Sequence, residues 1–508
     1  MRRTLAVIAF VGIALPTFAL VRPDAIFTSN MVLQREKVVP VWGKADPGES
    51  VVVEFAGRKV LGRAGNDGRW EVLLQPLKMC AEGRALLIGP HRLQNVVVGD
   101  VWLISGQSNA EMSFAWGILD GKREMSVSAR YPNVRAVKID HKTTPFAGSE
   151  ETPVLLGGWM VCNNETLGSV TAMGYFMARE INRRTGVPIG ILNDNWSGCR
   201  IEPFICLEGM RQVPALSNEV VKVERVRREY ADWCRKVAMA TDETGCGRAG
   251  VMPADMMWTL QHNAMIEPLV RFPIRGCAWY QGCSNGGEGP EYVDKLRALV
   301  GGWRMKWGYD FPFYIVQLSS FTAKTDDPAV GNGYARTREA QRIAAETIPN
   351  CGVVVTIDIG NATDIHPKNK RDVGERLARW TLRDVYGQKN LVVSGPLFKE
   401  MKVVGNTAVI SFTHVGGGLM AGEKGPDTPG IKPVPSADGK LRGFSVKGQD
   451  GIWHWADAKI VGETVVLSAK GVDSPTAARY AYRANPMGDC NLYNREGLPA
   501  SPFATDCW

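Results

Sequence analysis

The sequence has little that favours a metal site or a membrane-spanning body. After the first twenty residues, no apolar run approaches the roughly 20 residues that a transmembrane helix needs. No Cys-x-x-Cys pair and no cysteine–histidine cluster has the spacing of a zinc site. Internal repeats and long biased tracts are also absent, which argues against repeat proteins and disordered chains. We therefore expect a folded globular protein with no metal and no cofactor.

The excess of positive over negative charge is also small. The formal net charge is +8 over 508 residues, and the basic residues are scattered apart from one short cluster, Lys368, Lys370 and Arg371. Nucleic-acid binding usually involves a larger basic patch, so we expect no nucleic-acid partner. A small anionic substrate is compatible with this charge but is not required by it.

The cysteines do not form an obvious framework. There are eleven of them, an odd number, so at least one thiol stays free or pairs outside the chain. Near candidates for disulfides are Cys490 with Cys507 and Cys199 with Cys206, but sequence alone cannot establish the connectivity.

The N-terminus predicts export. Arg2 and Arg3 precede an apolar run of about 16 residues that is broken by Pro16, and small residues lead up to a cleavage position at Ala19. We expect residues 1–19 to be a signal peptide and the mature protein to be periplasmic or extracellular. The alternative is an uncleaved membrane anchor, for which the run is short.

The rest of the chain divides into three regions. Its length exceeds what one hydrophobic core usually supports. Short β-rich runs with turn signals predict an N-terminal β domain at residues 20–97. Strand-like runs separated by helix-like stretches predict an α/β catalytic domain with a mostly parallel sheet at residues 98–388. The β pattern returns at residues 389–508, which predicts a C-terminal β-sandwich-like domain.

Five apolar runs of the middle region predict buried strands of this sheet, at residues 101–104, 187–192, 276–280, 313–317 and 353–357. Polar or glycine-rich residues follow each of them. Because active sites of open parallel sheets form at the carboxyl ends of the strands, we expect the chemistry in these following segments. A charged stretch at residues 219–237 predicts a solvated helix with no chemical role.

Ser108 is the candidate nucleophile. The strand at residues 101–104 leads into Gly106 and Gln107, and helix-compatible residues follow the serine. A serine in such a turn exposes its hydroxyl at the sheet edge, and its own N–H points to where an oxyanion would form. The alternative is a serine that only caps a helix.

His366 is the candidate base among only six histidines. It follows the last predicted strand, and Asp358 and Asp364 are close in sequence, so either could orient the imidazole as the third member of a triad. Asp364 is our choice. Asp358, a backbone carbonyl or no acid at all remain open, as does a histidine that is merely a loop residue.

Two further strand ends offer hydrogen-bond donors for an oxyanion. Gly198 follows the second strand and lets its N–H approach a substrate closely. Gln281, with Asn285 as the alternative, follows the third strand and brings a side-chain amide. Together with Ser108 and His366, these segments supply every part that acyl transfer needs.

The motifs are similar to those of a known family. Gly106-Gln107-Ser108-Asn109, residues 279–285 with Gln281, and Asp364-Ile365-His366-Pro367 resemble the ordered blocks of sialate O-acetylesterases within the SGNH hydrolases. Segments at residues 30–35 and 491–503 resemble the terminal β regions of that family, so the likeness spans nearly the whole mature chain.

This resemblance implies a flavodoxin-like, three-layer SGNH core with β elaborations and hydrolysis through an acetyl-enzyme without a metal. It assigns Ser108 as nucleophile and His366 as base. The oxyanion hole would consist of the Ser108 N–H, the Gly198 N–H and the Gln281 side chain. The implied substrate is an O-acetylated sialic acid or a related acetylated glycan.

Three positions depart from the family pattern. Cys283 stands where the family commonly has glutamate, Ser197 precedes Gly198 where many members have paired glycines, and Thr363 takes the usual position of the aspartate. Cys283 also raises the alternative of a thiol nucleophile, although a small buried cysteine is the commoner outcome. Arg200 is a candidate ligand for a substrate carboxylate, with a structural ion pair as the alternative.

Two rival functions remain. The same machinery would serve an acetylxylan or other glycan O-acetylesterase, because specificity lies in pocket contacts that the sequence does not reveal. A non-catalytic glycan-binding protein is the rival of another class. Hydrolysis of a generic acetyl ester separates this rival from both esterases.

Overall fold

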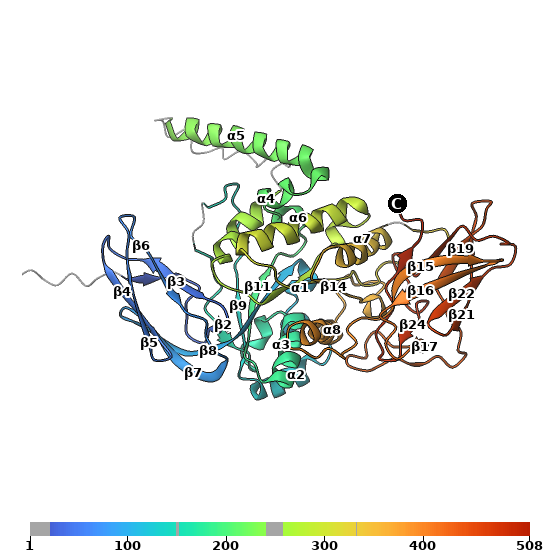
Figure 1. Cartoon of the computed structure of the whole chain (residues 1–508), viewed down its shortest axis with the longest axis horizontal. Helices are drawn as coiled ribbons and strands as arrows, with labels where there is room; N and C mark the ends of the chain where they lie inside the picture. Colours follow the sequence, from blue (N-terminus) through green and yellow to red (C-terminus); the bar gives the residue numbers. More distant parts are fainter. Residues whose placement is uncertain (1–20, 149–151, 240–257, 332) are drawn as a thin grey trace, which may run out of the picture.

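A computed structural model of the protein describes residues 21–148, 152–239, 258–331 and 333–508. Figure 1 shows N-terminal strands in blue, a layered central region from cyan to yellow and C-terminal strands in orange and red. The predicted signal peptide, residues 1–19, lies outside the described residues, as does the run that would form a membrane anchor. Within the described ranges, no helix is both long and apolar enough to cross a membrane.

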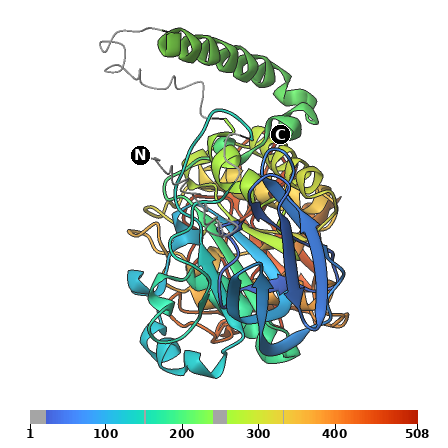
Figure 2. The same cartoon turned by 90° about the vertical axis from the view of Figure 1, so that its left-hand side faces the viewer.

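The N-terminal region consists of two small sheets. An antiparallel sheet has the order β1 (Arg22–Pro23), β3 (Val39–Lys44) and β6 (Arg69–Leu74). The other strands, which lie on the second sheet, are β2 (Val32–Gln34), β4 (Ser50–Phe55), β5 (Arg58–Arg63) and β7 (Cys80–Ile88). Figure 2 shows these strands facing the viewer.

One long strand joins this region to the centre. β8 (His91–Gly106) pairs antiparallel with β7 and, further along, parallel with two central strands. The predicted boundary between residues 97 and 98 therefore falls inside a continuous strand, and the central sheet grows directly out of the N-terminal one.

The central sheet is parallel apart from one short edge strand. Its order is β10-β9-β11-β8-β12-β13-β14, and only β10 runs antiparallel to its neighbour. The strands besides β8 are β9 (Val134–Lys138), β10 (Met160–Val161), β11 (Ile189–Asn195), β12 (Gly276–Tyr280), β13 (Phe313–Val316) and β14 (Cys351–Val354). Gly106 of β8 is level with Asn195 and with Tyr280, so the loops after these three strands emerge together.

Helices cover both faces of this sheet, as Figure 1 shows. One face packs against α3 (Ala172–Thr185) and α8 (Lys370–Asp384), with the short α2 (Gly121–Val127) nearby. The other face packs against α4 (Leu207–Arg211), α6 (Pro290–Trp307) and α7 (Tyr334–Thr347). Residues 101–104 alternate between these two cores, which is why the strand is apolar without interruption. The charged helix α5 (Ser217–Met239) projects away from the rest in Figures 1 and 2.

The C-terminal region contains only short antiparallel strands around one core. A four-stranded sheet has the order β15 (Leu397–Val404), β16 (Thr407–Thr413), β22 (Thr464–Ser468) and β21 (Asp457–Val461). A second has the order β20 (Trp453–Trp455), β19 (Phe444–Lys447), β23 (Ala477–Tyr480) and β25 (Phe503–Ala504). A third consists of β18 (Val434–Pro435), β17 (Leu419–Glu423) and β24 (Leu492–Asn494). Ile410, Val446 and Leu492 meet in the common core.

The predicted mixed α/β architecture with β-rich regions on both sides is confirmed. The suggested disulfides are not formed: Cys199, Cys206, Cys490 and Cys507 are all free thiols. Cys206 Sγ instead accepts a hydrogen bond from the Gly209 N–H, and Cys199 packs against the Gly106 carbonyl. The Cys199 and Cys206 thiols are therefore buried side chains that contact the backbone and do not crosslink the chain.

Candidate active site

The turn that carries Ser108 is held tightly to the neighbouring strand. Gly106 has φ +136°, and a Cβ at this position would lie 2.3 Å from the Tyr280 carbonyl oxygen, so only glycine fits. The next residue, Gln107, donates its backbone N–H to the same carbonyl at 3.0 Å. Ser108 then begins α1 (Ser108–Glu111), a single helical turn. This close crossing presents the serine at the carboxyl edge of the sheet.

The structure brings Ser108 and His366 together across 258 residues of sequence, with His366 Nε2 2.9 Å from Ser108 Oγ. In the neutral tautomer with a proton on Nδ1, the serine hydroxyl donates to Nε2. This is the hydrogen bond between nucleophile and base that the sequence predicts.

Asp364 faces the other side of the imidazole. Its Oδ1 lies 3.5 Å from His366 Nδ1 and accepts the His366 backbone N–H at 2.8 Å. The alternative acid, Asp358, is placed elsewhere, because Arg376 binds both of its oxygens at 2.7 Å in the interior. Of the two aspartates, Asp364 is therefore the one in position to orient His366, although its distance to Nδ1 is long for a hydrogen bond.

The surroundings keep His366 neutral at pH 7. Burial lowers the pKa of the imidazole, the Asp364 carboxylate raises it, and the positive charges of Lys370 and Lys368 lower it. The resulting pKa of His366 lies below its ordinary value of 6.5, so the unprotonated form, which can accept a proton, predominates at neutral pH.

Two backbone N–H groups in the turns after β8 and β11 are free to bind an oxyanion. Ser108 N and Gly198 N have no hydrogen-bond acceptor within the described ranges. Gly198 is exposed and has φ +74°, which favours glycine. Its loop is anchored to the nucleophile strand, because the Trp196 N–H donates to the Gly106 carbonyl at 3.0 Å.

Glu111 is a positioning residue that the sequence interpretation missed. Its Oε2 accepts hydrogen bonds from the Ser197 N–H at 3.0 Å and the Ser197 hydroxyl at 2.6 Å, and Lys138 Nζ donates to Oε1 at 3.1 Å. Burial raises the pKa of Glu111, but the hydrogen bonds from Ser197 and Lys138 lower it by more than burial raises it. The pKa of Glu111 therefore lies below its usual value. Glu111, three residues after Ser108, thus connects α1 to the Gly198 loop. Its position in the helical turn that follows Ser108 was the sequence feature from which this role could have been predicted.

Trp116 borders the site. It ends the short turn Phe114–Trp116, and its ring lies edge-on to the His366 ring with centroids 5.7 Å apart. The indole is 40% exposed. A flat apolar surface therefore lies open to solvent directly beside the base.

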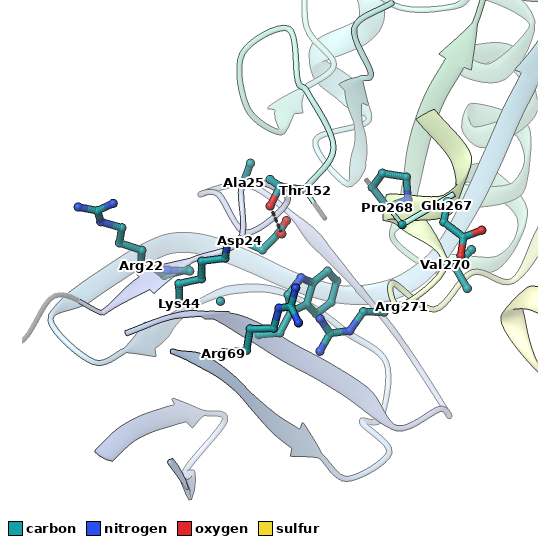
Figure 3. Close-up of a pocket in the computed structure, with 14 residues that line it drawn as sticks. Arg22, Asp24, Ala25, Lys44, Arg69, Thr152, Glu267, Pro268, Val270 and Arg271 are labelled. Atoms are coloured by element: carbon teal, nitrogen blue, oxygen red, sulfur yellow. Dashed lines mark hydrogen bonds between the residues drawn. The ribbon is translucent and has the colours of Figure 1, made fainter. Parts of the chain in front are cut away.

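A separate hollow of about 660 Å³ lies between the N-terminal strands and two loops of the central region (Figure 3). Basic and acidic side chains line it: Arg22, Lys44, Arg69, Arg271, Asp24 and Glu267. Figure 3 shows Thr152 donating to Asp24, at 2.9 Å. None of the predicted site residues lines this hollow, so we assign it no part in the chemistry around Ser108.

The described part of the chain contains no group of three or more histidine, cysteine or acidic side chains that could hold a metal ion. The polar side-chain groups that the structure brings together at this edge are the Ser108 hydroxyl, the His366 imidazole and the Asp364 carboxylate.

Comparisons with known proteins agree on a family. Residues 255–383 match the model of the family described as carbohydrate esterase, sialic acid-specific acetylesterase. The crystal structure of a novel carbohydrate acetylesterase from Xanthomonas citri has 32% sequence identity and a TM-score of 0.78, with 96% of this chain and 100% of that one covered. The chain belongs to this family of carbohydrate esterases.

More distant esterases extend the likeness. The human sialate O-acetylesterase is 26% identical over 94% of this chain and 90% of its own length. The mouse sialate O-acetylesterase is 27% identical over 76% of this chain and 77% of its own length. The predicted relationship to sialate O-acetylesterases is thereby confirmed.

Within this esterase, the two predicted amide donors belong to a buried hydrogen-bond network. Gln281 Nε2 donates to the Cys199 carbonyl at 3.1 Å and to Asn285 Oδ1 at 2.8 Å. Asn285 Nδ2 donates to the Glu202 and Glu288 carboxylates. The predicted role of either amide as an oxyanion donor would require these buried bonds to break. Instead, the Gln107 side chain fixes this turn, accepting the Gly282 and Cys283 N–H groups at 2.9 and 3.0 Å.

Arg200 is also committed within the protein. It binds Glu202 at 2.8 Å, the Ser284 carbonyl at 2.8 Å and Glu288. Lys295 joins the same two carboxylates at 2.8 and 2.7 Å. The structural ion pair that we considered as the alternative for Arg200 is therefore what the structure shows.

The Cys283 thiol stays protonated in this esterase. Burial raises its pKa above the ordinary value of 9.0. A protonated thiol is a poor nucleophile, and the imidazole of His366 hydrogen-bonds to Ser108 instead. The geometry thus favours the serine over the thiol as the attacking group.

Proposed function

We propose that this esterase hydrolyses O-acetyl esters of sialic acids through an acetyl-enzyme on Ser108, within an SGNH-type, flavodoxin-like core. The observation that carries the proposal is the 2.9 Å contact between His366 Nε2 and Ser108 Oγ at the carboxyl edge of a parallel sheet. Membership of the acetylesterase family supports the acetyl group as the acyl part, and the curated sialate O-acetylesterase relatives support the sugar.

The geometry performs the first half of the reaction as follows. Neutral His366 accepts the Ser108 proton as Oγ attacks the acetyl carbonyl carbon. The negative charge that develops on the carbonyl oxygen is stabilised by the Ser108 and Gly198 N–H groups, each worth about 10²- to 10³-fold in rate. The Asp364 carboxylate stabilises the imidazolium. The imidazolium then protonates the departing sugar oxygen, which leaves an acetylated serine.

The second half regenerates the enzyme. Water replaces the sugar beside His366, gives a proton to Nε2 and attacks the acetyl carbonyl through the same oxyanion site. The tetrahedral intermediate collapses, the proton on Nε2 passes to Ser108 Oγ, and acetic acid leaves, which loses its remaining proton to water.

A neutral acetylated glycan such as acetylxylan is the second candidate substrate. The observation that favours it is the commitment of Arg200 to Glu202 and Glu288, which leaves the predicted carboxylate ligand occupied. The exposed Trp116 indole suits either substrate, because an apolar ring face packs on a sugar whether or not the sugar carries a charge.

Export is part of the proposal. Residues 1–19 have the composition of a signal peptide, and an enzyme that acts on large extracellular glycans must leave the cytoplasm to reach them.

The test is acetate release from 9-O-acetylated sialic acid and from acetylated xylan, measured side by side with wild type and Ser108→Ala. Faster, Ser108-dependent release from the sialate supports the proposal. A preference for xylan would keep the mechanism and replace the substrate. No Ser108-dependent release from either ester would overturn both the mechanism and the substrate.

A further inference from the structure

Lys370 is a buried charged group that the scheme above does not use. It is the first residue of α8, its side chain is fully buried, and no carboxylate of the described residues forms an ion pair with it. A cation is unfavourable at a helix N-terminus, and burial of an unpaired charge is costly. Burial lowers the pKa of Lys370 to about 7. A residue that costs stability in both ways calls for a functional reason.

The contacts of Lys370 lead to both catalytic segments. Its Nζ donates to Asn109 Oδ1 at 2.6 Å, and Asn109 Nδ2 donates to the Ile365 carbonyl at 3.0 Å. Asn109 directly follows Ser108, and Ile365 directly precedes His366. Because an ammonium only donates, it forces the oxygen of the Asn109 amide toward itself and leaves the nitrogen for Ile365.

The groups around Lys370 leave its charge uncompensated. The Tyr280 ring lies 5.2 Å from Nζ, and the nearby Cys283 thiol is protonated. The other charged groups that act on it are Lys368 and the partly exposed Asp364.

We propose that Lys370 is a positioning residue of the esterase reaction: through Asn109 it holds the Ser108 turn against the His366 loop, and its positive charge acts on the imidazole of His366 from close by. The inference rests on the proposed function, because it assigns Lys370 a role in the serine–histidine chemistry.

The first test replaces Lys370 by Met and measures kcat and KM for p-nitrophenyl acetate between pH 5 and pH 9. We expect kcat to fall about 10- to 100-fold, as for a misplaced catalytic pair, while KM changes little. The acidic limb of the profile moves to higher pH, because His366 loses a neighbouring positive charge. In wild type we expect kcat to decline as pH rises through the pKa of Lys370. This decline should be absent from Lys370→Met. Lys370→Arg, which keeps the charge, retains more activity than Lys370→Met.

Stability separates this role from a structural one. The folded protein binds the Lys370 proton less tightly than the unfolded chain, so the buried charge penalises folding most below pH 7. Lys370→Met should therefore have a Tm at pH 6 no lower than that of wild type, despite its lower kcat. The matched control, Lys122→Met on the exposed face of α2, should change neither activity nor Tm.

The second test is Cys283→Glu, which places a carboxylate near Lys370. This carboxylate should raise the pKa values of both Lys370 and His366, so both limbs of the pH profile should move to higher pH. Unchanged limbs in both Lys370→Met and Cys283→Glu, with wild type active and Ser108→Ala inactive, would overturn the role of Lys370 and leave the proposed function intact. An inactive wild type would instead count against the proposed function itself.

Discussion

At the scale of single residues, His366 is subject to opposing influences. Burial and two lysines favour the neutral imidazole, whereas Asp364 favours the charged one. The Asp364 Oδ1 is 3.5 Å from Nδ1, and the same carboxylate is partly exposed and lies 3.6 Å from Lys368 Nζ. The acid is thus placed to orient the imidazole but holds it less firmly than a short buried hydrogen bond would.

This geometry predicts a moderate effect of Asp364→Asn. We expect kcat to fall about 10- to 100-fold, less than the roughly 10⁴-fold typical of a tightly bonded triad aspartate. Because Asp364 raises the pKa of His366, its loss lowers that pKa, and the acidic limb of kcat/KM moves to lower pH. The pH–rate profile of the variant measures both effects. A limb displaced to higher pH would contradict the assigned contact.

Trp116 is a second single residue whose contribution can be tested. If a sugar ring packs on its exposed indole, Trp116→Ala should raise KM roughly fivefold to tenfold, the equivalent of about 1 kcal/mol of lost contact, with little change in kcat. Steady-state kinetics on an acetylated sugar tests this. Trp455→Ala is the control, since Trp455 is equally exposed, at 39%, but lies in the C-terminal region. An unchanged KM in Trp116→Ala would rule out this packing surface.

At the scale of elements, the site depends on how α1 is joined to the loop after β11. Glu111 makes that connection through Ser197 and Lys138. If the Gly198 N–H binds the oxyanion as proposed, we expect Glu111→Gln to lower kcat about tenfold, because the Gly198 loop loses a contact that holds it in place. The free energy of unfolding should also fall by about 1 to 3 kcal/mol, since a charged hydrogen-bond acceptor is lost beside buried donors.

Paired measurements of kcat and chemical denaturation test this prediction, with the exposed Glu165→Gln as control. A variant that loses stability but keeps wild-type kcat would show that Glu111 does not position the oxyanion loop.

The strands of the sheet were largely predictable from sequence. Uninterrupted apolar runs matched β11, β12, β13 and β14 to within a few residues, because a strand covered on both faces must be apolar throughout. The run at residues 101–104 matched only the last part of β8, which begins ten residues earlier, at His91. β9 was missed because Arg135 and Lys138 interrupt its apolar pattern. Arg135 reaches the Asn30 carbonyl at 3.0 Å and Lys138 reaches Glu111, so tertiary partners compensate these charges.

The site was predictable where the chain itself dictates geometry. Ser108, Gly198 and His366 follow strand ends, and strand ends meet at one edge. The side chains of Gln281 and Asn285 follow a strand end too, but their direction depends on distant partners, namely Tyr292, Glu202 and Glu288. Sequence gives the position of such an amide without the contacts that orient it.

At the scale of the whole molecule, one buried acid couples stability to pH. Asp194 on β11 is fully buried, and within the described residues neither of its carboxylate oxygens has a hydrogen-bond partner. Burial raises its pKa to about 8. The folded protein therefore holds the Asp194 proton more tightly than the unfolded chain, and the stability that this proton confers is lost as pH rises from about 4 to 8.

Asp194→Asn cannot ionise and should escape this loss. We expect its free energy of unfolding relative to wild type to increase between pH 5 and pH 8, on the order of a few kcal/mol. Urea denaturation of both proteins at the two pH values measures the difference. A difference that is the same at both values would show that Asp194 has a partner that stabilises its charged form.

The central claim for the molecule as a whole is that one serine, activated by one histidine, carries the esterase reaction. The most direct measurement is the rate of p-nitrophenyl acetate hydrolysis at pH 7 by wild type and Ser108→Ala, with Tm recorded for both. The account predicts a loss of about 10³-fold or more in the variant with an unchanged Tm. A folded Ser108→Ala protein that retains its rate within a few-fold of wild type would contradict it.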